Sequence, residues 1–306
     1  MNLPDSVMKR FAPLAAFLAA LLLPLTAVAI EVIDDAGHSI RLTRPAQRIV
    51  SLAPHVTELL FAAGAGSKVV GVVQHSDYPP AATALPQVGS HTRVDLEAVA
   101  ALKPDLVIAW KSGNRDAHLD RFTALGIPVF VNEPRSLEAV ALSLEQFGRL
   151  AGTEASANAA ATRFRQRQAA LAARYGNRPP VRLFYQIWNS PLMTINDEQV
   201  ISDAIRLCGG ENVFGGLKQL APRVSTEAVL AANPEAIVAS GMADSRPEWL
   251  DQWKRWPALA ANANGNLFFI PPDLIQRHTP RLLDGAERLC GQLEEVRAKR
   301  APGAAR

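Results

Sequence analysis

The chain repeats one pattern of residues, and this repeat constrains the fold more than any other feature. Residues 94–110 read VDLEAVAALKPDLVIAW, and residues 224–240 read VSTEAVLAANPEAIVAS. Each copy has a polar residue suited to begin a helix, a glutamate in the first turn, a proline and then an apolar run. Such a run is typical of a strand buried on both faces of a parallel sheet. The repeat predicts two similar units, each with a helix followed by a buried strand.

Weaker similarities extend the pattern to the rest of each unit. The predicted pairs are opening strands at Arg48–Pro54 and Arg182–Ile187, helices at Thr57–Gly66 and Asp203–Asn212, and later strands at Gly126–Glu133 and Gly265–Pro272. Strands that alternate with helices are typical of parallel α/β sheets. We therefore predict an α/β fold with two Rossmann-like lobes, at residues 47–152 and 177–297.

A long helix is predicted between the lobes, at residues 153–176. The segment TEASANAAATRFRQRQAALAARY is rich in Ala and Arg and contains neither Gly nor Pro, so it favours a helix. Its length of about 35 Å would make it a rigid bridge rather than a flexible linker. Residues 30–46 are expected to form an N-terminal hairpin, and residues 298–306 a tail.

The first 29 residues are typical of a secretory signal. Lys9 and Arg10 precede an apolar run rich in Ala, Leu and Phe, and Ala27-Val28-Ala29 is a small-x-small cleavage site. The run is short for a membrane span. We predict cleavage after Ala29 and a periplasmic location; the alternative is an uncleaved anchor.

Export would place the two cysteines in an oxidising compartment, where Cys208 and Cys290 can form a disulfide. Both lie in the second predicted lobe. Closing a loop of about 80 residues would stabilise the fold by roughly 4–5 kcal/mol in the loop-entropy model. The alternative is two separate buried thiols.

Composition and motifs exclude several classes of function. The formal net charge is only +3, and no Lys/Arg run alternates with aromatic residues, so we expect no nucleic-acid partner. Nucleophile-elbow, zinc-protease and P-loop motifs are absent from the sequence. Gly64-Ala-Gly66 follows a predicted helix rather than opening one, which argues against dinucleotide binding. We expect neither an enzyme nor a bound cofactor.

Two facing α/β lobes imply a cleft at the carboxyl ends of their strands. The loops expected there contain His55, His75 and His91 in the first lobe and His278 in the second. Imidazoles suit transition metals. The alternative, separate hydrogen-bonding histidines on loops, is favoured over binding of a free metal ion.

Several stretches together resemble one family. They are RIVSLAPHVTELLFAAGAG, HSDYPPAA, DLEAVAALKPDLVIAWKSGN, LCGGENVF, VSTEAVL and QRHTPRLLDGAERLC. They resemble the periplasmic cobalamin-binding proteins that feed ABC importers, over residues 47–297. The resemblance implies two lobes bridged by one long helix. It also implies a monomer that captures cobalamin or a related corrinoid, and delivers it to a dimeric permease in the inner membrane.

The resemblance also implies a set of ligand-binding residues. In the family, a tyrosine precedes the S-D-Y-P-P stretch, where this chain has His75, and a D-W-F-E-R loop corresponds to residues 273–277 here. Ala221 replaces a tryptophan. The expected ligand-binding residues are His75, His91, Trp188, Asp273, Leu274, Ile275, Gln276 and Arg277. His75 or His91 is also a candidate axial ligand to the cobalt of a corrinoid.

Glu97 and Glu227 occupy the same register of the repeat, one in each lobe. In the resembled family, glutamates at these positions meet arginines of the permease. The alternative is that they only stabilise helix N-termini. Haem or a ferric siderophore is the alternative ligand on the same scaffold, and a two-lobed metalloenzyme is a distant alternative.

Overall fold

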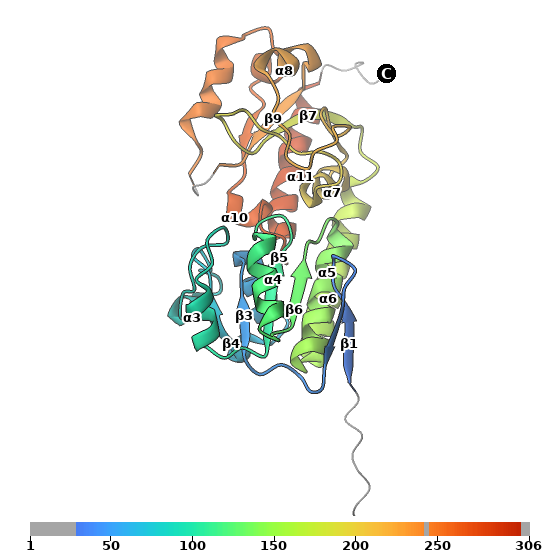
Figure 1. The fold of residues 1–306 in the computed structure, drawn as a ribbon. Helices are drawn as coiled ribbons and strands as arrows, with labels where there is room; N and C mark the ends of the chain where they lie inside the picture. Colours follow the sequence, from blue (N-terminus) through green and yellow to red (C-terminus); the bar gives the residue numbers. More distant parts are fainter. Residues whose placement is uncertain (1–28, 242–244, 301–306) are drawn as a thin grey trace, which may run out of the picture.

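The computed structural model describes residues 29–241 and 245–300, which form two lobes joined by a long helix (Figure 1). The predicted signal peptide, apart from its last residue, lies outside the described residues. The first lobe has a parallel sheet of order β4-β3-β5-β6. Its elements are β3 (Ile49–Ser51), α2 (Pro54–Ala62), η2 (Gly66–Lys68), β4 (Val69–Val72), η3 (Pro80–Ala84), α3 (Leu96–Ala101), β5 (Leu106–Trp110), α4 (Asp116–Ala124), β6 (Val129–Asn132) and α5 (Leu137–Ala151).

The second lobe repeats this topology. Its parallel sheet has the order β10-β9-β7-β8, so each strand occupies the place of its counterpart in the first lobe. Its elements are β7 (Val181–Gln186), α7 (Val200–Leu207), β8 (Gly210–Asn212), α8 (Thr226–Ala232), β9 (Ala236–Ala239), η4 (Glu248–Arg255), α9 (Ala260–Ala263), β10 (Leu267–Phe269), α10 (Pro272–Ile275) and α11 (Leu282–Lys299). The prediction of two parallel α/β lobes is confirmed.

The sequence repeat has the same local structure in both lobes. The Asp95 side chain accepts a hydrogen bond from the Ala98 amide at the start of α3, and Ser225 caps α8 through the Ala228 amide in the same way. Such caps satisfy amides that have no partner within the helix. The repeat therefore encodes one helix-to-strand unit twice.

The acidic residue after the proline of each copy also has an equivalent role. Asp105 accepts a hydrogen bond from the Arg48 amide at 2.9 Å, and Glu235 accepts one from the Arg182 amide at 3.1 Å. Both arginine guanidinium groups donate to a carbonyl near the end of the preceding helix. These bonds fix the start of the central strands β3 and β7 next to the end of the repeat helix.

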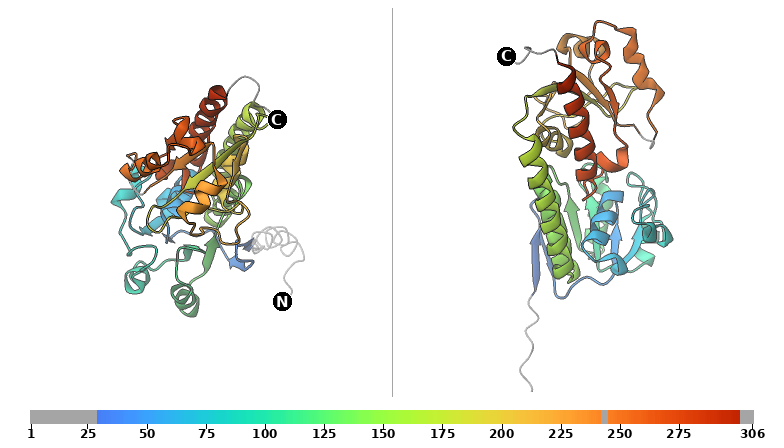
Figure 2. Two further views of the ribbon diagram at one scale, coloured as in Figure 1. Left: turned by 90° about the horizontal axis from the view of Figure 1, so that it is seen from above. Right: turned by 180° about the vertical axis from the view of Figure 1, so that it is seen from behind.

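The bridging helix α6 (Glu154–Tyr175) runs along the back of the molecule, where Figure 2 shows it beside the first lobe with its end at the second lobe. It packs antiparallel to α5, and Arg165 on α6 pairs with Glu138 and Glu145 on α5. Gly152, in the left-handed region at φ 66°, ends α5 and allows the chain to reverse.

The described cysteines form the predicted disulfide, between Cys208 at the end of α7 and Cys290 on α11. The helix predicted at Asp203–Asn212, with a Gly-rich turn at its end, begins earlier than expected, because α7 starts at Val200 and its last helical residue is Leu207. Gly209 has a φ of 67°, which ends the helix, and the next residues pair with β7 as the edge strand β8. An antiparallel hairpin, β1 (Ile30–Ile33) and β2 (Ser39–Leu42), packs beside α5 and β6.

Candidate functional site

A cavity of about 340 Å³ lies where the two lobes meet. Its walls come from the segments that follow β5, β6 and β7, as expected for a ligand site beyond the carboxyl ends of parallel strands. The lining residues are Trp110, Ser112, Glu133, Pro134 and Arg135 from the first lobe, and Ile187, Ile195, Glu198, Gln199, Val200, Ile201, Leu220, Ala221, Gln276 and His278 from the second. A second cavity of about 690 Å³ lies within the first lobe, between β2, β6 and α4, away from this junction.

Four rings form a continuous chain across the junction of the lobes. His91 lies 5.7 Å from Trp110 between ring centroids, Trp110 lies 5.4 Å from His55, and His55 lies 5.4 Å from His278. The first three belong to the first lobe and His278 to the second. Aromatic rings at such spacings pack favourably. This chain of rings therefore joins the lobes at one side of the cavity.

These imidazoles are held in the neutral form. Burial lowers the pKa of His55 well below its usual value, and the neighbouring His278 and Arg277 lower it further. Burial lowers the pKa of His278 to about 4. Burial and the nearby His75 lower the pKa of His91. Near neutral pH, the ring chain therefore adds polar nitrogens to the site without adding charge.

An ion-pair group joins the loops that face each other across the lobes. The Nη1 atom of Arg277 lies 2.6 Å from Oδ1 of Asp77, and Nη2 lies 2.9 Å from Oδ1 of Asp273. Burial opposes ionisation of Asp77, but the hydrogen bond and charge of Arg277 outweigh it and lower the pKa of Asp77. Arg277 is thus neutralised by two carboxylates, one from each lobe.

A second, more buried ion pair lies beside the first. Arg281, at the start of α11, donates to both carboxylate oxygens of Glu58 on α2, at 2.8 and 2.7 Å. The Glu58 side chain is only 3% exposed. The Arg281 guanidinium also lies 3.8 Å from the centroid of the Tyr78 ring. Bidentate pairs of this kind define a geometry, so Arg281 fixes the orientation of the lobes.

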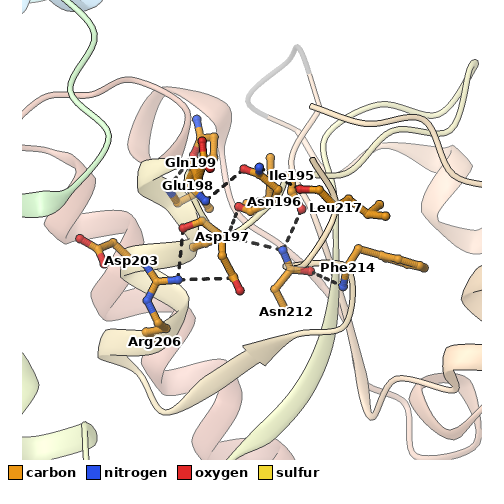
Figure 3. Close-up of polar contacts among 12 residues, drawn as sticks. Ile195, Asn196, Asp197, Glu198, Gln199, Asp203, Arg206, Asn212, Phe214 and Leu217 are labelled. Atoms are coloured by element: carbon orange, nitrogen blue, oxygen red, sulfur yellow. Dashed lines mark hydrogen bonds and ion pairs between the residues drawn. The ribbon is translucent and has the colours of Figure 1, made fainter. Parts of the chain in front are cut away.

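Asparagine side chains hold the second-lobe wall of the cavity in place (Figure 3). Asn212 donates to the Ile195 carbonyl at 2.8 Å, and Asn196 donates to the Leu217 carbonyl at 3.0 Å. The Asn196 amide oxygen also accepts from the Glu198 amide. Buried side-chain bonds to backbone groups rigidify a segment without regular structure. The network therefore positions Glu198 and the neighbouring lining residues.

Five of the ligand-binding residues predicted from the sequence lie near the junction. His75 is exposed and adopts a φ of 65° just before Asp77. His91 packs on Trp110. Asp273 and Arg277 form the ion-pair group, and Gln276 lines the cavity while donating to the Ser240 carbonyl.

The other three predicted residues lie elsewhere. Ile275 has no exposed surface and packs in the hydrophobic core, and Leu274 packs against the same core. Trp188 is 37% exposed but is absent from the cavity lining, and its indole N–H donates to the Ser190 carbonyl. The apolar surface of the cavity comes instead from Trp110, Ile187 and the segment around Ile195. Trp110 was identifiable from its position at the end of a predicted strand, whereas the segment around Ile195 has no such signal.

Glu97 and Glu227 both lie at the second position of their helices, α3 and α8, with exposed side chains. A backbone hydrogen bond and the Ser225 side chain lower the pKa of Glu227. Their equivalent positions follow directly from the repeat.

Residues 29–241 and 245–300 contain no cluster of three or more His, Cys, Asp or Glu residues suited to hold a metal ion. Within the same residues, none of the helices has the length and apolar character needed to cross a membrane.

Comparisons with known proteins agree with this architecture. The chain matches the family model described as "Periplasmic binding protein" over residues 49–274. It is 37% identical over 256 residues to a "Vitamin B12-binding protein" of Vibrio parahaemolyticus, covering 84% of this chain and 92% of the relative. It is also 37% identical over 262 residues to one from Yersinia pestis, covering 83% and 90%.

Solved structures show the same similarity. The crystal structure of the periplasmic vitamin B12 binding protein BtuF of Vibrio cholerae is 36% identical with a TM-score of 0.76, covering 83% of this chain and 98% of that one. A periplasmic heme binding protein from Pseudomonas aeruginosa is 27% identical with a TM-score of 0.67, covering 80% and 92%. From the family match across both lobes and these identities over more than four fifths of the chain, we conclude that the chain belongs to the periplasmic binding protein family.

Proposed function

We infer that this protein is a periplasmic receptor that captures cobalamin or a related corrinoid and delivers it to an ABC importer. It acts by binding rather than by catalysis, as members of its family do, and cobalamin is its transported ligand rather than a cofactor. The observation that supports this function most strongly is the similarity to vitamin B12-binding proteins, which extends over both lobes and the bridging helix.

A corrinoid is too large to lie wholly inside about 340 Å³, so we place the ligand at the junction of the lobes, with part of it against the residues that line this cavity. This cavity has apolar surface from Trp110 and Ile187, with a few polar groups such as Gln276 and Ser112. Sites for large organic ligands typically combine apolar walls with a small number of orienting polar groups. Exposed His75 and the Arg277 ion-pair group lie beside it and are proposed to contact the rim of the ligand.

Isothermal titration calorimetry with cobalamin, cobinamide and haem tests the function. We expect saturable binding of at least one corrinoid and weaker binding of haem. In the His75→Ala and Arg277→Ala variants, corrinoid affinity should fall about tenfold, because each removes a polar contact worth roughly 1–2 kcal/mol. His38→Ala, at an exposed histidine of the hairpin, is the control and should bind like the native chain.

Haem is the second candidate ligand, because a heme binding protein is among the similar structures, His278 lines the cavity and His91 packs on Trp110 of the cavity wall. Visible absorption spectra decide between them. A native chain that binds haem but neither cobalamin nor cobinamide would contradict the corrinoid assignment.

We further propose that Glu97 and Glu227 dock the protein on its importer. They project from equivalent helix starts on the two lobes. A dimeric permease offers the same patch twice, so a receptor with one carboxylate on each lobe is suited to it. Charge-assisted pairs of this kind orient the encounter and accelerate it.

A further inference from the structure

Among the described residues that line the cavity, His278 and Trp110 each have a ring nitrogen that is buried without a hydrogen-bond partner, and His278 is the one in the second lobe. The residue follows α10, lines the cavity and is only 5% exposed. Its ring packs against His55 of the first lobe. The Nδ1 atom of His278 is buried and forms no hydrogen bond with any residue that the structure describes.

The neighbouring Gln199 determines which nitrogen of His278 has the proton. The backbone amide of Ile201 donates to Oε1 of Gln199 at 2.6 Å, which identifies the other terminal atom as the NH₂ group. This NH₂ group lies 3.3 Å from Nε2 of His278 and can act only as a hydrogen-bond donor. Nε2 of His278 therefore accepts through its lone pair.

In a neutral imidazole, one nitrogen is a donor and the other an acceptor. Since Nε2 accepts from Gln199, the proton lies on Nδ1. Burial lowers the pKa of His278 to about 4, so the ring is neutral near pH 7. His278 thus has a single N–H donor, which is buried beside the cavity and has no acceptor among the described residues. A buried donor without an acceptor is costly and indicates a missing partner.

The charges around the cavity indicate which acceptor fits. Arg277, next to His278, pairs with Asp77 and Asp273. Arg135, the arginine among the described residues that line the cavity, pairs with Glu198. The Glu133 carboxylate also belongs to the cavity wall. Among the described residues of the cavity wall, no unpaired arginine or lysine is left to neutralise an anionic group, which would also lie near these carboxylates. An uncharged carbonyl oxygen needs only a hydrogen-bond donor.

We propose that His278 is a specificity-determining residue, whose Nδ1–H donates a hydrogen bond to an uncharged amide carbonyl on the rim of the bound ligand. This inference rests on the proposed corrinoid function and makes it more specific. The site would select the amide form of a corrinoid over forms in which a peripheral amide is hydrolysed to a carboxylate. Gln199 is the positioning residue, since it holds the tautomer that makes the donor available.

Two substitutions and one spectrum test the proposal. In His278→Ala the donor is lost, and we expect cobalamin affinity to fall about tenfold in calorimetry. In His278→Asn the side-chain amide places an N–H near the position of Nδ1, so affinity should stay within about threefold of native. Thr279→Val is the matched control. Thr279 is buried and its hydroxyl has no partner among the residues that the structure describes, but it does not line the cavity.

Nitrogen-15 NMR of the histidine rings supplies a readout independent of affinity. The free native protein should show His278 protonated on Nδ1 only, and cobalamin should shift that N–H signal. The monocarboxylate derivatives of cobalamin, compared one by one, should include at least one that binds about tenfold more weakly to the native chain but not to His278→Ala.

The outcomes distinguish failure of the proposed role of His278 from failure of the proposed corrinoid function. If His278→Ala and His278→Asn lose affinity equally, if the His278 proton lies on Nε2, or if every monocarboxylate binds like cobalamin, then the proposal is wrong while the function stands. If the native chain binds no corrinoid, the proposed function fails first. Thermal unfolding of each variant shows whether a loss of affinity comes from a loss of folding.

Discussion

His55 and His278 are neutral imidazoles buried where the lobes meet, and this burial makes stability depend on pH. In the unfolded chain, a histidine such as His278 binds a proton near pH 6.5, whereas in the folded chain its pKa is lowered to about 4. Between these values the unfolded state binds more protons, so protonation favours unfolding. Stability is therefore greatest above pH 6.5 and is lost as the pH falls.

We expect the free energy of unfolding, measured with urea, to fall by about 3 kcal/mol between pH 7 and pH 4 from His278 alone. The His278→Asn variant cannot titrate there and should show a shallower slope. Thr279→Val is the comparison, because it changes a buried side chain next to His278 that carries no titratable group, and it should leave the slope unchanged. An equal slope in native protein and His278→Asn would show that His278 is not held neutral.

Among the helices and strands, the pair α7 and α11 is linked covalently. The disulfide joins residues 82 positions apart, and both cysteines are fully buried. The same helices also meet through Arg297 on α11, which donates to the Cys208 carbonyl after the end of α7. The cross-link therefore reinforces a contact that packing and hydrogen bonds already form.

Removing the disulfide should destabilise the chain by roughly 4–5 kcal/mol, because the unfolded state regains the entropy of an open loop. We expect Cys208→Ala, Cys290→Ala and the double variant to lose nearly the same stability in urea, since each breaks the same bond. If the double variant instead loses about the sum of the two single losses in free energy of unfolding, the losses come from the packing of each cysteine side chain rather than from the disulfide. Mass mapping of native periplasmic material should find no free thiols.

At the scale of the whole molecule, the two lobes form one unit whose relative orientation is defined on both sides of the cavity. The Arg281–Glu58 pair lies on one side. On the other, the Asp203 carboxylate of α7 accepts from the Leu137 amide at the start of α5. A fixed orientation of the lobes also fixes the separation of Glu97 and Glu227, which a docking surface requires.

Replacing both Glu97 and Glu227 with Gln should leave corrinoid affinity unchanged but weaken stimulation of the importer's ATPase activity and uptake. Each single variant should have a smaller effect, because one lobe can still engage. The double variant Asp120→Asn with Glu211→Gln removes two exposed carboxylates, one from each lobe, and serves as the matched control. If the double variant Glu97→Gln with Glu227→Gln supports normal corrinoid uptake at physiological salt, the docking proposal is wrong. The two glutamates then only stabilise the N-termini of their helices.

The elements that local sequence determines were predictable. Asp95 and Ser225 begin equivalent helices, the apolar runs after them form β5 and β9, and the Ala-rich segment forms α6. The boundaries of helices and strands were less predictable where a few residues can be either a turn or a strand. Gly210–Asn212, for example, pairs as an edge strand beside β7. Pairing of that kind depends on a neighbour distant in the chain rather than on local preference.

The candidate site shows the same division. Sequence pattern and the resemblance to a family indicated two lobes, a long bridging helix, a cleft and a corrinoid as ligand. Only the tertiary structure brings Arg277 to Asp77 and His278 to His55, across some 200 residues of chain, and places Ile275 in the core rather than at the cleft. Helix caps, apolar periodicity and composition act over a few residues. The contacts that shape the cavity form only when residues distant in the sequence come together at the junction of the two lobes, so no local pattern in the sequence specifies them.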